Sequence, residues 1–299
     1  MDAYSAIHSD VAPPERNSAR WSESQTAERI FGITGDLPPM PHIAALVMER
    51  LYDDQSTPTG IYQLIMKDQA LAASVLRVAN SPYYGASRTI STLRDAVMFM
   101  GFDSIRSLIM TAVLRGVYLS AGFSEHLLWE HALACGIASR KIADEAGLQS
   151  REQAYLAGLM HDVGKAVLFQ RSPALMREIM QEVYNEGSDF FKVEQQKLGF
   201  THAEVGGIIA GKWHFPIDLE EAIGNHHTPG LSNSALELAH IVNLANLICH
   251  KLSVGPTRKP DLDLDQSESA GAVGLGPASI EKILVSVSEA LQVENSAEA

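Results

Sequence analysis

The sequence predicts an all-α protein. Apolar residues recur at spacings of three and four over most of the chain, which is the period of an amphipathic helix. No segment shows sustained two-residue alternation with enrichment in β-branched residues, so no strand is predicted. Hydrophobic residues make up 46% of the 299 residues, enough to form a sizeable core.

The front of the chain, residues 27–120, follows a polar stretch, 1–26, that we expect to be a flexible lead. Asn80-Ser81-Pro82 and Gly101 are expected to stop helices, and Asp103 is a plausible N-cap. Apolar periodicity predicts helices over 42–52, 59–66, 69–80, 92–100 and 103–118.

The back of the chain, residues 121–253, is also predicted to be helical. None of the eleven histidines lies between 43 and 125, whereas most lie between 126 and 250, which suggests two distinct helical parts. Residues 254–277, rich in Pro, Gly, Asp and Ser, predict a loop or linker before a closing helix over 278–292. The helices expected in the back are 126–146, 151–169, 173–186, 189–197, 201–212, 218–225 and 235–252.

Composition excludes several classes of function. A net charge of −13 without a basic run argues against a nucleic-acid surface, which needs clustered Lys and Arg. No apolar run reaches the roughly 18–20 residues that cross a bilayer, so no membrane partner is expected. Cys135 and Cys249 fall inside apolar helical patterns and are interpreted as inert core thiols. With no signal peptide visible, we expect a cytoplasmic protein.

Histidine and aspartate side chains form the pattern that could carry chemistry. Imidazole and carboxylate on several helices suit one or two first-row divalent ions, which activate water and bind phosphate oxygens. Lys165, one turn after His161, could meet an anionic ligand such as phosphate. The residues of this pattern are His131, His161, Asp162, His202, His226 and His227.

Each of these residues also has an ordinary structural interpretation. A single histidine on an apolar helix face is usually a hydrogen-bonded core residue, and Asp162 could be a surface residue at a helix turn. The pair His226-His227 could form an exposed turn. The ordinary interpretation is preferred for His126, His214, His240 and His250.

Several blocks of sequence resemble a known superfamily. The order of His131 and then His161-Asp162 in HDVGK resembles the HD superfamily of metal-dependent phosphohydrolases, and His202 and His226-His227 look like the additional histidines of its HD-GYP branch. Upstream, LPPMPHIAALVMERL, QLIMKDQALAASVLRVANSPYYG and ISTLRDAVMFMGFDSIRSLIM are similar to the front half of the HDOD family, the HD-related output domains of bacterial signalling. The resemblance covers about 36–250 and implies a multi-helix HD-like domain packed against a helical N-terminal HDOD subdomain.

Two departures bear on function. Asn246 stands where an HD enzyme is expected to have an Asp ligand, and the GYP segment of the HD-GYP phosphodiesterases is missing after His227. An asparagine carbonyl is a weaker ligand than a carboxylate. Since HDOD proteins are generally regarded as regulatory and non-catalytic, the resemblance implies a signal-transduction output protein. It would act through a signalling protein partner or a nucleotide messenger.

Two functions other than that of a regulatory output protein also agree with the sequence. One is a metal-dependent phosphohydrolase in which Lys165 helps neutralise the phosphate. The other is a protein that holds a metal for structure or sensing, without catalysis. In either case one or two divalent ions (Fe, Mn, Ni or Zn) are the expected cofactors. Their ligands would come from His131, His161, Asp162, His202, His226 and His227, with Asn246 as a weak ligand.

Overall fold

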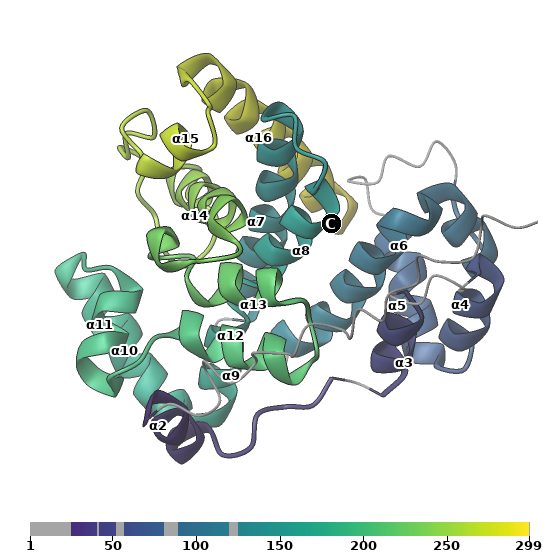
Figure 1. The fold of residues 1–299 in the computed structure, drawn as a ribbon, viewed down its shortest axis with the longest axis horizontal. Helices are drawn as coiled ribbons and strands as arrows, with labels where there is room; N and C mark the ends of the chain where they lie inside the picture. Colours follow the sequence, from purple (N-terminus) through teal and green to yellow (C-terminus); the bar gives the residue numbers. More distant parts are fainter. Residues whose placement is uncertain (1–24, 41, 52–56, 81–88, 120–124, 299) are drawn as a thin grey trace, which may run out of the picture.

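The computed structural model describes residues 25–40, 42–51, 57–80, 89–119 and 125–298, and within these ranges every regular element is a helix (Figure 1). The all-α prediction is confirmed. The first helices are α2 (Gln25–Thr34), α3 (His42–Leu51), α4 (Pro58–Ile65), α5 (Gln69–Ala79) and α6 (Leu93–Tyr118). They are followed by α7 (Glu125–Glu145), α8 (Arg151–Met160), α9 (Val163–Arg171), α10 (Pro173–Glu186), α11 (Phe190–Leu198), α12 (His202–Lys212) and α13 (Ile217–Gly224). After the 3₁₀ turn η2 (Pro229–Leu231) come α14 (Leu236–Lys251), α15 (Glu268–Ala272) and α16 (Pro277–Glu298).

Helix α6 is continuous, so the predicted break at Gly101 and the predicted N-cap at Asp103 are wrong. The predicted start at Thr92 is confirmed, because Thr92 is the N-cap and its hydroxyl accepts a hydrogen bond from the backbone N–H of Asp95 at 3.0 Å. A glycine inside a helix costs only about 1 kcal/mol relative to alanine. Burial of the apolar residues of α6, such as Ile105, outweighs that cost.

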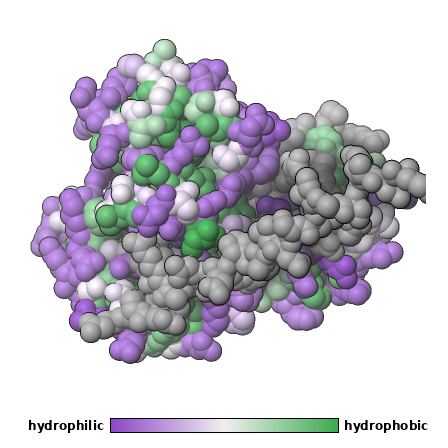
Figure 2. All heavy atoms as spheres, in the orientation of Figure 1, coloured by the Kyte–Doolittle hydropathy of each residue, from purple (hydrophilic) through white to green (hydrophobic). Residues whose placement is uncertain are grey.

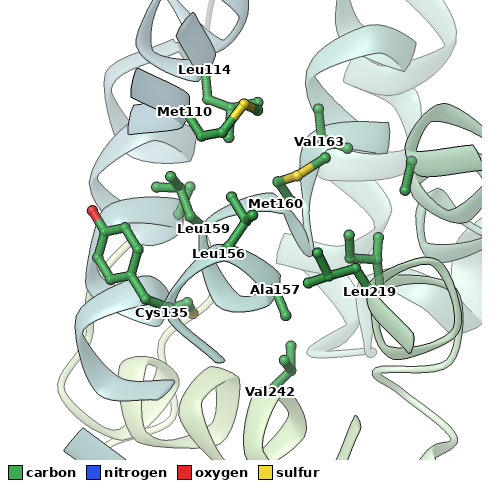
Figure 3. Close-up of a cluster of buried hydrophobic side chains, with 14 of the residues drawn as sticks. Met110, Leu114, Cys135, Leu156, Ala157, Leu159, Met160, Val163, Leu219 and Val242 are labelled. Carbon is green, nitrogen blue, oxygen red and sulfur yellow. The ribbon is translucent and has the colours of Figure 1, made fainter. Parts of the chain in front are cut away.

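Helix α6 connects the small group α3–α5 to the larger body formed by α7 and the later helices (Figure 1). The Ser107 hydroxyl donates to the Glu152 carboxylate at 2.7 Å, and the Tyr118 hydroxyl donates to the carbonyl of Leu159 at 3.2 Å. Figure 3 shows Met110 of α6 in one apolar cluster with Leu156 of α8 and side chains of α7, α9, α13 and α14. Helix α6 therefore anchors the group α3–α5 and also forms one wall of the apolar core of the body.

The chain breaks its helix at His161-Asp162, so the single helix predicted over 151–169 is wrong. Helix α8 ends at Met160 and α9 begins at Val163. Directly after the break, a Cβ atom at Gly164 would lie 2.0 Å from the carbonyl oxygen of His202. The backbone of α9 therefore packs directly on the backbone of α12. This contact brings His161 and Asp162 close to His202.

The segments at the two ends of the described chain pack on the body. Part of α2 falls in the predicted flexible lead, and the rest of that lead lies outside the described residues. Figure 1 places α2 beside α9, and Lys212 of α12 holds the following segment through Asp36 at 3.0 Å. At the other end, α15 lies inside the predicted loop 254–277, and α16 extends beyond the predicted 278–292.

Figure 2 shows that hydrophilic residues dominate the visible surface of the body, with smaller hydrophobic patches between them. Among the described helices, none combines the length and the apolar character needed to cross a bilayer.

Candidate metal centre

Asp162 lies at the middle of a ring of imidazoles that come from different helices. The Nε2 atom of His202 is 3.1 Å from Asp162 Oδ1, and that of His161 is 3.4 Å from Asp162 Oδ2. His131 Nε2 lies 3.7 Å from Oδ2, and His226 Nε2 lies 4.0 Å from Oδ1. All five side chains are at most 1% exposed. The fold therefore brings four of the predicted histidine ligands together around the buried carboxylate of a fifth predicted ligand, Asp162.

Main-chain carbonyls fix the orientation of three of these rings. His161 Nδ1 lies 2.7 Å from the carbonyl oxygen of Gly158, and His226 Nδ1 lies 2.8 Å from that of Ile223. Both histidines follow the last turn of a helix, where carbonyl groups lack partners within the helix. Because a carbonyl oxygen only accepts, Nδ1 carries the proton and the Nε2 lone pair points toward Asp162.

His131 is held in the same way by a segment far along the chain. Its Nδ1 lies 3.0 Å from the carbonyl oxygen of Val254. Gly255 follows with a φ of +94°, and a Cβ atom there would lie 2.7 Å from the Cβ of His131. Only glycine fits both the positive φ and this close approach.

His202 differs from the other histidines because it contacts a second buried carboxylate, Glu194. Its Nδ1 and its backbone N–H lie 2.5 and 2.8 Å from Glu194 Oε2. Burial on its own would lower the pKa of His202, but the Glu194 carboxylate, together with Asp162, raises it above the usual 6.5. His202 is therefore the imidazole of this site that is most readily protonated, whereas burial lowers the pKa of His161 to about 3.

Lys165 places a positive charge inside the site. Its ammonium group lies 2.9 Å from Asp162 Oδ2 and 5.0 Å from the centre of the Phe190 ring, and the residue is 4% exposed. Burial raises the pKa of Asp162, but the neighbouring imidazoles and Lys165 outweigh this effect and hold the pKa well below its usual value. Two carboxylates, Asp162 and Glu194, thus face one lysine and one readily protonated histidine.

The remaining predicted ligands lie at the edges of the ring. His227 Nε2 is 3.0 Å from His202 Nε2, and the His227 ring stacks on Phe191 with ring centres 4.4 Å apart. Asn246 Oδ1 is 3.0 Å from His131 Nε2. All seven residues predicted from the sequence therefore gather in one part of the structure.

The donor atoms suit a first-row divalent ion. Buried atoms without a hydrogen-bond partner include His161 Nε2 and His226 Nε2, and the Asp162 carboxylate lies beside both, so nitrogen and oxygen donors meet here. Two groups have ligand atoms within 4.8 Å of one another: His131 with His161 and Asp162, and His202 with His226 and His227. Unpartnered buried polar atoms are costly, and a cation would satisfy them.

The sequence did not indicate four neighbours of this centre. The ring of His250 stacks on His131 with centres 5.4 Å apart, Glu194 contacts His202, and Cys135 and Cys249 lie next to His131. Helical spacing could have suggested three of them, because Cys135 follows His131 by four residues, and Cys249 and His250 follow Asn246 by three and four. Nothing local to the sequence indicates Glu194.

Of the other histidines for which the ordinary interpretation was preferred, His126 and His214 are exposed. His240 is buried, and its Nδ1 lies 3.0 Å from the Ser269 hydroxyl.

Comparison with solved structures supports the fold. An HDOD domain protein of unknown function from Geobacter sulfurreducens is 27% identical, with a TM-score of 0.75 over 89% of this chain and 96% of that one. A candidate signal transduction protein from Marinobacter aquaeolei VT8 is 20% identical, with a TM-score of 0.74 over 94% of this chain and 65% of that one. A candidate phosphohydrolase from Shewanella amazonensis SB2B is 22% identical, with a TM-score of 0.72 over 89% and 97% of the two chains.

Sequence comparison identifies the family. A protein of Treponema pallidum (strain Nichols), named only as uncharacterized, is 22% identical over 241 residues, which are 80% of this chain and 47% of that protein. The chain thus spans about half the length of that curated relative. Residues 37–229 match the family model of the HDOD domain, which is more than half of the chain. The chain therefore belongs to the HDOD domain family.

Proposed function

We propose that this chain is a regulatory protein of signal transduction that acts by binding a partner protein, and that its HD-like centre holds a divalent metal ion without catalysing a reaction. The observation that carries the proposal is the charge of the centre. Asp162 is the only carboxylate facing the ring of imidazole Nε2 atoms among the described residues, and Lys165 already pairs with it. The position that an HD enzyme is expected to fill with a second carboxylate holds the neutral Asn246.

Metal binding is supported by the orientation of the ligands. His161 and His226 present Nε2 lone pairs that no other described group uses, and the Asp162 carboxylate lies beside both. A bound divalent ion would add positive charge beside Asp162, which pairs with Lys165 without it. Because His202 must be deprotonated at Nε2 to act as a ligand, protonation should compete with metal binding, which should weaken at low pH.

The closed surroundings of the centre argue against turnover. Catalytic metal sites keep a coordination position open for water or substrate. Here His131, His161, Asp162 and His226 are at most 1% exposed, and Lys165 is 4% exposed. A phosphate ester would have to reach an ion enclosed by these side chains, whereas a bound ion that holds four helices together needs no such access.

Metal content and hydrolysis, measured on the same preparations of the full chain, test the proposal. Protein purified without chelator is assayed by elemental analysis and with a panel of phosphodiesters that includes bis(p-nitrophenyl) phosphate. We expect about one divalent ion per chain and no hydrolysis. The double variant His161→Ala/Asp162→Ala should lose the ion held by this centre, while His126→Ala, which removes an exposed histidine outside the centre, should keep it.

A metal-dependent phosphohydrolase is the second candidate, favoured by the convergence of six histidine and aspartate side chains with Lys165. Asp162→Asn discriminates between the two. Hydrolysis that is present in the wild type and lost in this variant would overturn the non-catalytic assignment. Metal content lost in the variant without any hydrolysis in the wild type would support it.

A further inference from the structure

Two buried thiols lie on the side of His131 next to Asn246. Cys135 is one turn beyond His131 on α7, and Cys249 comes from α14, three residues after Asn246. Both thiols are free and fully buried. Ligand atoms of His131, Cys135 and Cys249 lie within 4.8 Å of one another. We propose that these three residues form a second cation site, specific for a thiophilic ion such as Zn²⁺, which shares His131 with the centre around Asp162.

The measured geometry suits such an ion. A tetrahedral Zn²⁺ with ordinary bond lengths places a sulfur and a nitrogen ligand about 3.6 Å apart. The distance between Cys135 Sγ and His131 Nε2 is 3.7 Å. Asn246 Oδ1, 3.0 Å from the same nitrogen, is placed to act as the fourth ligand. Little movement of His131 and Cys135 would therefore be needed to bind the ion.

The charges also balance. Two thiolates neutralise a divalent ion, and His131 and Asn246 add no charge, so the loaded site would be neutral and compatible with full burial. A thiol binds a metal ion as a thiolate, so each cysteine must give up its proton when the ion binds. Loading exchanges one divalent ion for two thiol protons, which leave to solvent, and no electrons are transferred.

The two sites compete for His131. Its Nδ1 proton is donated to Val254, which leaves one lone pair, on Nε2. That nitrogen is 3.7 Å from Cys135 Sγ and also 3.7 Å from Asp162 Oδ2. One lone pair can bind one ion, so an ion on the sulfur side withdraws His131 from the Asp162 centre. This inference stands whether or not the regulatory role proposed above is correct.

Cobalt absorption tests the sulfur site directly. The metal-stripped full chain is titrated with Co²⁺ under a phosphine reductant, which contributes no thiol, and thiolate-to-cobalt charge transfer is recorded in the near ultraviolet. These are the only two cysteines in the 299 residues, so any such band must come from them. We expect the band to appear, to disappear when Zn²⁺ is added, and to accompany the release of two protons per ion, measured with an indicator dye.

Matched variants separate the two sites. Cys135→Ser and Cys249→Ser should each weaken the band, and the double variant should abolish it, whereas Asp162→Asn should keep it. If the serine variants do not fold, the same question is answered on the wild type by alkylation: Zn²⁺ should protect both thiols from iodoacetamide under mild denaturation. Absence of the band with Co²⁺ bound elsewhere would overturn the proposal. Isolation of the protein with a Cys135–Cys249 disulfide in place of bound metal would also overturn it.

Discussion

The front helices α3–α6 and the helices of the body bury different kinds of side chain. In the front, the buried polar residues that the structure describes are hydroxyls, Ser107 and Thr111 on α6. The body buries ionisable groups as well, among them Asp162, Lys165 and Glu194. Burial of a charge costs several kcal/mol, and a buried partner offsets only part of that cost. The body therefore carries a cost in stability that the described part of the front does not.

Glycine substitutions should give the largest contrast between the two regions. A Cβ at Gly164 would lie 2.0 Å from a backbone oxygen in the body, while one at Gly116 of α6 would meet nothing within 4 Å. Gly164→Ala should lower the free energy of unfolding by about 5 kcal/mol or more, while Gly116→Ala should raise it by roughly 0.5–1 kcal/mol. Urea unfolding followed by circular dichroism measures both, and equal effects would contradict the close packing of α9 on α12.

Removal of the buried positive charge of Lys165 should have the next largest effect on the free energy of unfolding. Lys165→Met leaves the Asp162 charge buried without its lysine and should cost at least about 3 kcal/mol in metal-free protein. An added divalent ion should restore more stability to this variant than it adds to the wild type, because it replaces the missing charge. Lys282→Met, which breaks an exposed pair with Glu145, is the control and should not change the melting temperature. No loss of stability in Lys165→Met would mean that Asp162 is not paired in solution.

Glu220 should make the body sensitive to pH. Burial and the neighbouring Glu221 charge raise the pKa of Glu220 from 4.5 to about 7. A carboxyl group whose pKa is raised on folding favours the native state below pH 4.5, and this contribution is lost as the pH rises through about 7. Glu220→Gln should therefore stabilise the protein by on the order of 2 kcal/mol at pH 8.5 and hardly at all at pH 4.

Glu221 on the same helix is the matched control for Glu220. It accepts hydrogen bonds from the backbone N–H groups of Asn233 and Ser234, both at 2.9 Å. Burial raises its pKa, but these bonds outweigh burial and lower it. Glu221→Gln should thus destabilise the protein at pH 8.5, and melting temperatures at that pH should shift in opposite directions for the two variants. The same sign for both would contradict the assignment.

Substitution of the threonines that cap two helices should give the smallest changes in stability. The two substitutions should differ in their effect on metal content. Thr92 caps α6 in the front, and Thr201 forms a capping box with Glu204 at the start of α12 in the body. Each Thr→Ala change should cost about 1 kcal/mol. Only Thr201→Ala should also reduce metal content, because His202 is the first residue of α12. Serine at either position should restore both properties, and a metal loss in Thr92→Ala would show that the two regions are coupled.

Sequence patterns predict an element well where its signals are local. The predicted helix 173–186 has the bounds of α10, because Pro173 starts it and Gly187, at a φ of +65°, ends it. The break at His161-Asp162 could not be predicted in this way. It depends on the approach of Gly164 to the backbone of His202, which lies 38 residues later in the chain.

The same distinction holds for the candidate centre. Residue type and order indicated the histidines and Asp162. The pairing of Lys165 with Asp162 became visible only in the structure, where the two side chains lie 2.9 Å apart. Glu194 was missed because α11 and α12 must pack before its carboxylate reaches His202.

The carbonyl groups that hold His131, His161 and His226 belong to the main chain at positions 254, 158 and 223. A main-chain carbonyl is present whatever side chain the position carries, so point mutation cannot delete these supports. The direction of the imidazoles is therefore inherited with the fold, separately from the carboxylates that set the charge of the centre. Such a frame would keep its histidines aimed at the same point whether position 246 carried an acidic side chain or, as here, an asparagine.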